Sequence, residues 1–74
     1  MKEVNYKITV ILQLTYENGD RTLARYNWFL SDLIILITHF TGKLEIEYKE
    51  KSGSYYLKCN NEDYENAIKK IELS

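Results

Sequence analysis

The sequence has no proline, one cysteine, one histidine and three glycines among its 74 residues. One cysteine cannot form an internal disulfide, and one cysteine with one histidine cannot supply the four ligands of a closed structural zinc site. Long hydrophobic runs are also missing, because the longest, Leu33–Ile37, is far shorter than the ~20 residues that cross a bilayer. The first residues are polar and do not resemble a secretory signal. We therefore expect a cytoplasmic protein without a membrane segment.

There is no excess of charge of either sign, since ten Lys and Arg face eleven Asp and Glu, for a net charge of −1. Nucleic-acid binding usually relies on surplus positive charge, so we expect no direct contact with nucleic acid. The apolar fraction is large, at 45% hydrophobic and 14% aromatic, which argues against intrinsic disorder. The length fits one domain that covers residues 1–74.

The first predicted element is a strand over Tyr6–Glu17, where apolar and polar residues alternate. A two-residue Asn-Gly turn after it would mix the apolar and polar faces of the hairpin. A three-residue loop over 17–19 places the large apolar groups on one face instead, with Gly19 in the left-handed conformation. The resulting register pairs Leu14 with Thr22, Leu12 with Ala24, Val10 with Tyr26 and Ile8 with Trp28. The second strand is therefore expected at about 21–29.

A helix is predicted over 32–41, with Ser31 as its N-terminal cap and Gly42 as its terminator. The apolar run Leu33–Ile37 has strong strand propensity, so an extended conformation is the alternative. We prefer the helix because capping residues stand at both ends and because two hairpins need a crossover between them.

The second half repeats the pattern, with a strand over 43–49, a turn at Ser52-Gly53 and a strand over 54–60. A two-residue loop at that turn pairs Tyr48 with Leu57, Ile46 with Cys59 and Glu47 with Lys58. Asn61 is then expected to cap an amphipathic final helix. Together these elements predict an α+β fold, a four-stranded antiparallel sheet in strand–strand–helix–strand–strand–helix order with both helices packed on one face.

No group of residues has the spacing of a catalytic or metal-binding site. Cys59 falls on the buried side of its strand, which is typical of a small apolar residue. His39 lies near the end of the first helix, where it can interact with the helix's negative end, and it lacks partners at ligand spacing. The glycines are isolated turn or cap residues. We predict that the protein is not an enzyme and uses neither a metal nor a cofactor.

Three features could instead carry binding. The first helix has more apolar surface than one stripe needs, at Ile34 and Ile35, which either the final helix or another molecule covers. Acidic residues including Glu45 and Glu47 form either a solvated face or an imitation of phosphates. Arginines beside Tyr56 on the outer face of the sheet, Arg21 and Arg25, could stack on single-stranded nucleic acid.

A resemblance to a known family adds a target. The segment Tyr6–Gln13, then Asn18-Gly19-Asp20, a tyrosine-bearing strand and Leu30-Ser31-Asp32 opening a helix resemble the short dimeric uracil-DNA glycosylase inhibitors of Bacillus-infecting phages. The similarity covers about residues 6–48. It implies a phage protein that occupies the DNA site of a host enzyme, with an apolar pocket gripping the enzyme's DNA-probing loop. Where the family has aromatic pocket residues, this sequence has Leu33 and Ile37.

We therefore predict a non-catalytic protein that binds and inhibits a host DNA-acting enzyme, most specifically uracil-DNA glycosylase. The predicted partner-binding residues are Leu33, Ile34, Ile37, Thr38, Glu45 and Glu47. The alternatives are another phage counter-defence protein such as an anti-CRISPR, a single-stranded nucleic-acid-binding protein, and a structural subunit that associates with itself as a homodimer.

Overall fold

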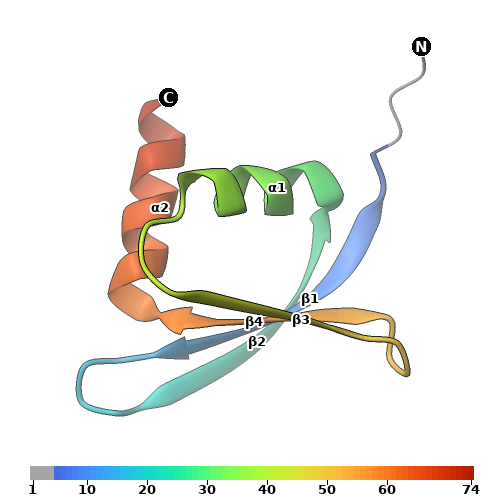
Figure 1. Ribbon diagram of the computed structural model, residues 1–74, viewed down its shortest axis with the longest axis horizontal. Coiled ribbons are helices and arrows are strands. Elements are labelled where there is room, and N and C mark those ends of the chain that lie inside the picture. The colour runs from blue at the N-terminus through green and yellow to red at the C-terminus, as the bar shows by residue number, and fades with distance from the viewer. Residues whose placement is uncertain (1–4) are drawn as a thin grey trace.

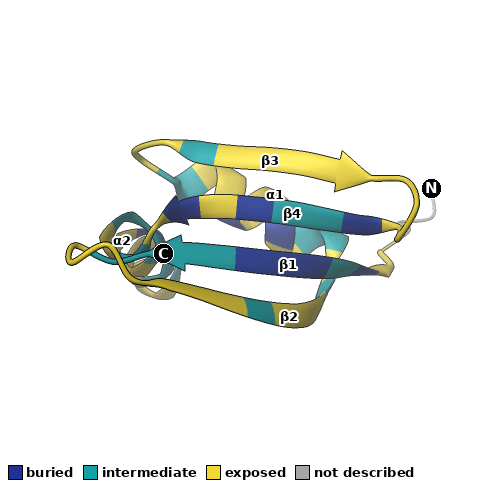
Figure 2. Cartoon of the chain, turned by 90° about the horizontal axis from the view of Figure 1, so that it is seen from below, coloured by how far each residue is buried: buried dark blue, intermediate teal, exposed yellow. Residues whose placement is uncertain are grey.

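The computed structural model describes residues 5–74 and has six elements in the predicted order. They are β1 (Lys7–Thr15), β2 (Arg21–Phe29), α1 (Leu30–His39), β3 (Leu44–Lys49), β4 (Ser54–Asn60) and α2 (Asn61–Leu73). Both helices lie on the same side of one four-stranded sheet (Figure 1). Viewed from the other side, all four strands are visible and no helix of the described residues lies in front of them (Figure 2). The fold is therefore α+β, as predicted.

The sheet is mixed, so the prediction of a fully antiparallel sheet was wrong. Its strand order is β2-β1-β4-β3, with two antiparallel hairpins joined by a parallel pairing of β1 with β4. The alternation of apolar residues determines which face a strand buries, but not which strands of two hairpins become neighbours. Here the connection through α1 runs from one edge of the sheet to the other. The two strands richest in buried residues therefore meet at the centre, where parallel pairs are usually found.

The first hairpin confirms the three-residue loop and its register. Ile8 lies opposite Trp28 and Val10 opposite Tyr26, and the other two predicted pairs are also found. The loop closes with a hydrogen bond of 2.8 Å from the Tyr16 N–H to the carbonyl of Asp20. Gly19 has a φ of +92°, a left-handed conformation that glycine adopts without a steric penalty.

The second hairpin has a four-residue loop over 50–53, so the predicted two-residue loop was wrong. The N–H of Gly53, whose φ is +65°, donates to the carbonyl of Lys49 at 2.8 Å. The strands pair Leu44 with Cys59, Glu45 with Lys58, Ile46 with Leu57, Glu47 with Tyr56 and Tyr48 with Tyr55. This register differs from the predicted one by two residues, which preserves the face of every side chain. It also brings the Tyr48 and Tyr55 rings to 4.8 Å between centroids.

Both helices begin differently from the prediction. α1 starts two residues earlier than expected, and Ser31 does not cap it. The amides of its first turn are bonded instead by the segment before β1, where the Tyr6 carbonyl and the Asn5 side chain accept from Leu30 and Ser31. In α2 the cap is Asn60, whose Oδ1 accepts from the Glu62 N–H at 2.8 Å, and not Asn61.

The core lies between the helices and the two central strands. Val10 of β1 and Leu57 of β4 are completely buried, and Leu33, Leu36 and Ala67 of the helices pack over them. α2 packs on β1 and β4, and α1 packs mainly on α2 and β2. The edge strand β3 therefore receives little cover from either helix.

Candidate binding surfaces

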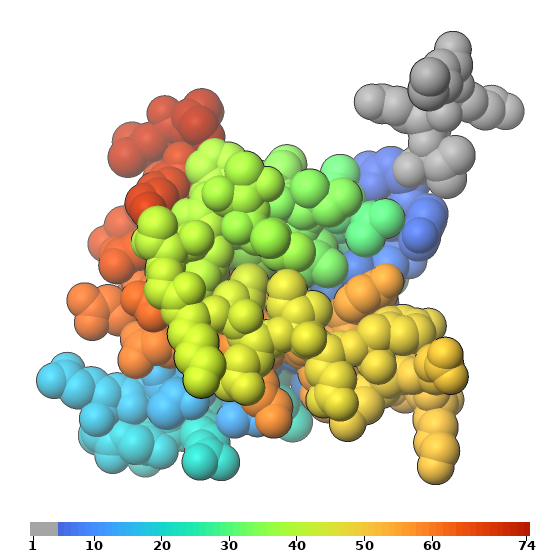
Figure 3. All heavy atoms as spheres, viewed as in Figure 1, coloured from blue at the N-terminus to red at the C-terminus, as the bar shows by residue number. Residues whose placement is uncertain are grey.

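Atoms of α1 and β3 lie side by side on the face of the molecule that Figure 3 shows, and both elements expose large apolar side chains. We call this area the α1–β3 surface and define it by Ile34 and Ile37 of α1 and Ile46 and Tyr48 of β3. These four side chains are 54, 43, 43 and 51% exposed. Ile46 and Tyr48 are on the helix side of the sheet, where Ile46 lies opposite the buried Leu57 and Tyr48 opposite the partly buried Tyr55. They stay exposed because neither helix packs closely on β3.

The predicted binding residues of α1 have different environments. Leu33 is 3% exposed and belongs to the core, so it is not accessible to a partner. Ile34 and Ile37 are accessible. Thr38 is exposed, and its hydroxyl donates to the carbonyl of Ile34 at 2.8 Å, so its polar group is already bonded within the helix. The structure therefore leaves two of these four residues as an apolar contact surface.

α2 covers only one flank of α1. Ile35 lies beside a shallow groove of about 270 Å³ between α1, α2 and β2, which Trp28, Tyr64 and Ile71 also line. Ile34 and Ile37 are not among the residues that line this groove. Ile35 is nevertheless 40% exposed, close to the 43% of Ile37, so the final helix does not cover the surplus apolar surface of α1.

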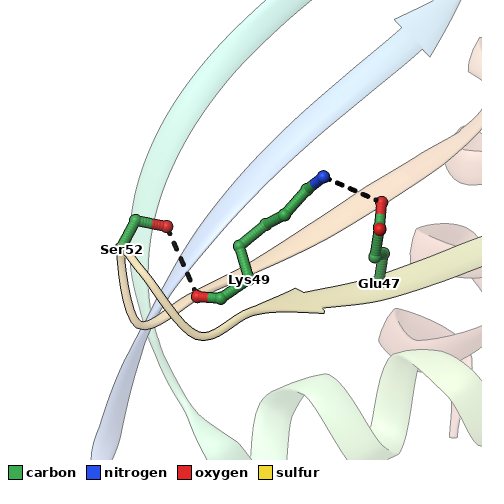
Figure 4. A network of polar contacts seen from close by, with 3 residues as sticks. All are labelled: Glu47, Lys49 and Ser52. Atoms are coloured by element: carbon green, nitrogen blue, oxygen red, sulfur yellow. Dashed lines mark hydrogen bonds and ion pairs between the residues drawn. The ribbon is translucent and has the colours of Figure 1, made fainter.

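The predicted acidic residues lie on the other face of the sheet from the α1–β3 surface. Glu45 is opposite Lys58 in the β3–β4 ladder. Glu47 has its Oε1 3.4 Å from the Nζ of Lys49, as Figure 4 shows. Each carboxylate therefore has a lysine beside it, and the two do not join Ile34 and Ile37 in one continuous site.

The face that Figure 2 shows carries an unexpected concentration of positive charge. We call it the open face; it consists of the odd-numbered residues of β1, β2 and β3 and the even-numbered residues of β4. Its charged members are Lys7, Arg21, Arg25, Lys49 and Lys58, with Glu45 and Glu47. The open face therefore has a net charge of +3, whereas the rest of the sequence has −4.

Apolar and aromatic groups lie among these charges. One row of the open face reads Arg25–Ile11–Tyr56–Glu47 across the four strands. Ile11 is only 9% exposed although no helix within residues 5–74 covers this face, so its strand neighbours must shield it. The Lys49 Nζ lies 5.6 Å from the centroid of the Tyr56 ring.

A second cation lies over an aromatic ring at the other edge of the open face, where the Lys7 Nζ is 5.2 Å from the centroid of Phe29. At one end of the sheet, a hollow of about 410 Å³ is lined by Arg21, Lys43 and Lys58 together with Glu45 and Asp63. Its size is in the range of small-ligand sites. The arginines and Tyr56 were recognisable from the sequence, but their grouping with the other charges was not, because it depends on which strands lie side by side.

Cys59 and His39, the only cysteine and histidine of the chain, both have contacts that explain them as structural residues. Cys59 is buried, and burial, with the Asp63 carboxylate nearby, raises the pKa of its thiol to about 11. A thiol with that pKa is a poor nucleophile at neutral pH. His39 bonds through Nδ1 to the carbonyl of Ile35 at 2.9 Å, in the last turn of α1. Among residues 5–74 there is no group of three or more His, Cys, Asp and Glu placed to hold a metal ion.

Comparison with known proteins yields no relative. No family model, no curated protein and no solved structure matches the chain. Within the described part of the chain, neither helix is long and apolar enough to cross a membrane.

Proposed function

We propose that this chain is a non-catalytic protein that works by binding another protein through the α1–β3 surface. The observation that supports this proposal is the exposure of four large apolar side chains on two neighbouring elements. Exposed large apolar side chains that gather on one side of a small domain are typical of interaction sites. The raised pKa of Cys59 argues against this thiol as a nucleophile.

As the specific partner we propose a DNA-acting enzyme, and uracil-DNA glycosylase in particular. The resemblance to phage inhibitors of that enzyme covers about residues 6–48, the part of the chain that contains α1 and β3. In this proposal Ile34 and Ile37 anchor an apolar loop of the enzyme, which then cannot engage DNA. Glu45 and Glu47 lie on the opposite face of the sheet beside lysines, so we assign the contact to Ile34 and Ile37 and not to these carboxylates.

A uracil-excision assay tests the target directly. Protein at a concentration equal to that of the glycosylase should abolish release of uracil, and Ile34→Glu should restore it. Leu73→Glu is the matched control, because Leu73 is 88% exposed near the end of α2, outside the α1–β3 surface. Full enzyme activity in the presence of the unaltered protein would remove this target.

Light scattering on the free protein tests whether the α1–β3 surface serves self-association instead. A monomeric mass supports a surface that is free for a different protein, such as the glycosylase or a CRISPR effector. A dimer that Ile34→Glu dissociates would show that a second copy occupies the surface, and would overturn the proposal of a different partner.

A further inference from the structure

We propose that the open face of the sheet is a binding site for single-stranded nucleic acid. This inference is independent of the proposed protein partner, because the α1–β3 surface lies on the helix side of the sheet. It also departs from the expectation that the protein does not contact nucleic acid. That expectation was drawn from the net charge of −1, which is the sum of +3 on the open face and −4 on the rest of the sequence.

Charge is the first support. The open face carries five cations and two carboxylates, and both carboxylates are on the edge strand β3. The remaining three strands of this face, β2, β1 and β4, carry Arg21, Arg25, Lys7 and Lys58 and no carboxylate. A cationic strip of this kind attracts a phosphate backbone, and binding to it releases counterions.

Aromatic placement is the second support. Tyr56 lies between Ile11 and Glu47 in one row of the sheet, partly buried, with Arg25 two strands away. Strands are ~4.8 Å apart, so Arg25 and Tyr56 are separated by about 10 Å across Ile11. Bases that are not paired can stack on a tyrosine ring and on an arginine plane, while cations alongside bind the phosphates.

The edges of the face repeat this combination. Lys7 lies over the exposed ring of Phe29 and Lys49 over the partly buried ring of Tyr56, so both rings have an ammonium group within 5.6 Å of their centroids. Stacking requires unpaired bases, which are exposed in single strands and hidden in duplexes. An acidic peptide would satisfy the cations but would leave Tyr56 and Phe29 without a stacking partner. We therefore infer a single strand as the ligand.

Fluorescence anisotropy with a labelled 20-nucleotide oligo-dT or oligo-U measures the binding. We expect binding at low salt, and a slope of log K against log salt between about −2 and −3.5, since each of three to five phosphate contacts contributes ~0.7. Tyr56→Ala should weaken binding roughly tenfold, because stacking contributes ~1–3 kcal/mol per base. Arg25→Gln should weaken binding and lower the slope by about 0.7.

Matched controls separate a specific site from general attraction. Lys69→Gln removes the same charge from the exposed side of α2 and should leave binding unchanged. Ile34→Glu should also leave it unchanged, so failure of the protein-binding proposal and failure of this one are distinguishable. Circular dichroism checks that each variant is folded. Tyr56→Phe keeps the aromatic ring and should retain binding. If Tyr56→Ala does not fold, the loss of affinity in Arg25→Gln relative to Lys69→Gln carries the test.

Three results would overturn the inference. The first is no binding to either oligonucleotide at 20 mM salt. The second is an equal loss of affinity in Lys69→Gln and Arg25→Gln, which would indicate nonspecific attraction. The third is equally tight binding of poly-glutamate, or of duplex DNA, because neither offers bases for Tyr56 to stack on.

Discussion

The two faces of this sheet are built from the same four strands, yet they differ in what covers them and in what they carry. On the helix side, Val10 and Leu57 are completely buried beneath α1 and α2. On the open face, the apolar Ile11 is shielded by neighbouring side chains of the sheet, and charged residues surround it. The comparison shows that one face supplies the stability of a small domain and leaves the other free for charge. Four predictions test this division.

The largest effect is expected at the centre of the covered face. Leu57→Ala removes a completely buried side chain and should lower the free energy of unfolding by about 2–5 kcal/mol. That is a large share of the stability of a 74-residue domain. Urea denaturation followed by circular dichroism measures the change. A loss below about 1 kcal/mol would mean that the core lies elsewhere.

A smaller effect is expected for the corresponding truncation on the open face. Ile11→Ala should cost about 1–2 kcal/mol, less than Leu57→Ala, because flexible side chains can close over the space and water can reach it. The same urea titration compares the two variants. Equal losses would show that the open face is as tightly packed as the helix side, contrary to the division drawn above.

Alkaline pH should lower the free energy of unfolding, because Cys59 is buried on the helix side of the sheet. Burial raises the pKa of this thiol from 9.0 to about 11 in the folded chain, so the unfolded chain loses the proton first. The stabilisation is therefore complete below pH 9 and is lost as the pH rises toward 11. Unfolding in urea at pH 8 and pH 10.5 measures the decline. Cys59→Ala should show a smaller decline, and an identical decline in both would assign it to other groups.

The smallest effect on stability is expected at the α1–β3 surface. Ile34 is 54% exposed, so Ile34→Glu should change the free energy of unfolding by no more than about 0.5 kcal/mol. Leu73→Glu should behave in the same way. Thermal unfolding of both variants provides the measurement. Unfolding of the Ile34→Glu chain alone would show that this residue belongs to the core and that no partner is needed to cover it.

The first hairpin was predictable in full because its constraints are local. Alternation over 6–17 determines which face is buried, and Gly19 selects the loop length that keeps large groups together. The second hairpin had weaker local signals. Two-residue and four-residue loops preserve the same faces, so parity could not choose between them, and the contact of Tyr48 with Tyr55 accompanies the longer loop.

The sequence could not show which of the predicted binding residues of α1 are exposed. Helical periodicity places Leu33 and Ile37 on one stripe, yet Leu33 is buried and Ile37 is not. The difference depends on the position of α1 over the sheet, beside α2 and at the uncovered strand β3. No pattern within a single helix contains that information.

The sequence by itself determined the six elements, the side of every strand that faces the helices and the register of the first hairpin, because these follow from residue spacing along a short stretch of chain. Only the tertiary structure decided that β1 runs beside β4 in parallel, that β3 stays uncovered and that cations gather on one face. Those features arise from contacts between segments far apart in the chain, where the alternation of each strand is satisfied equally well by several arrangements.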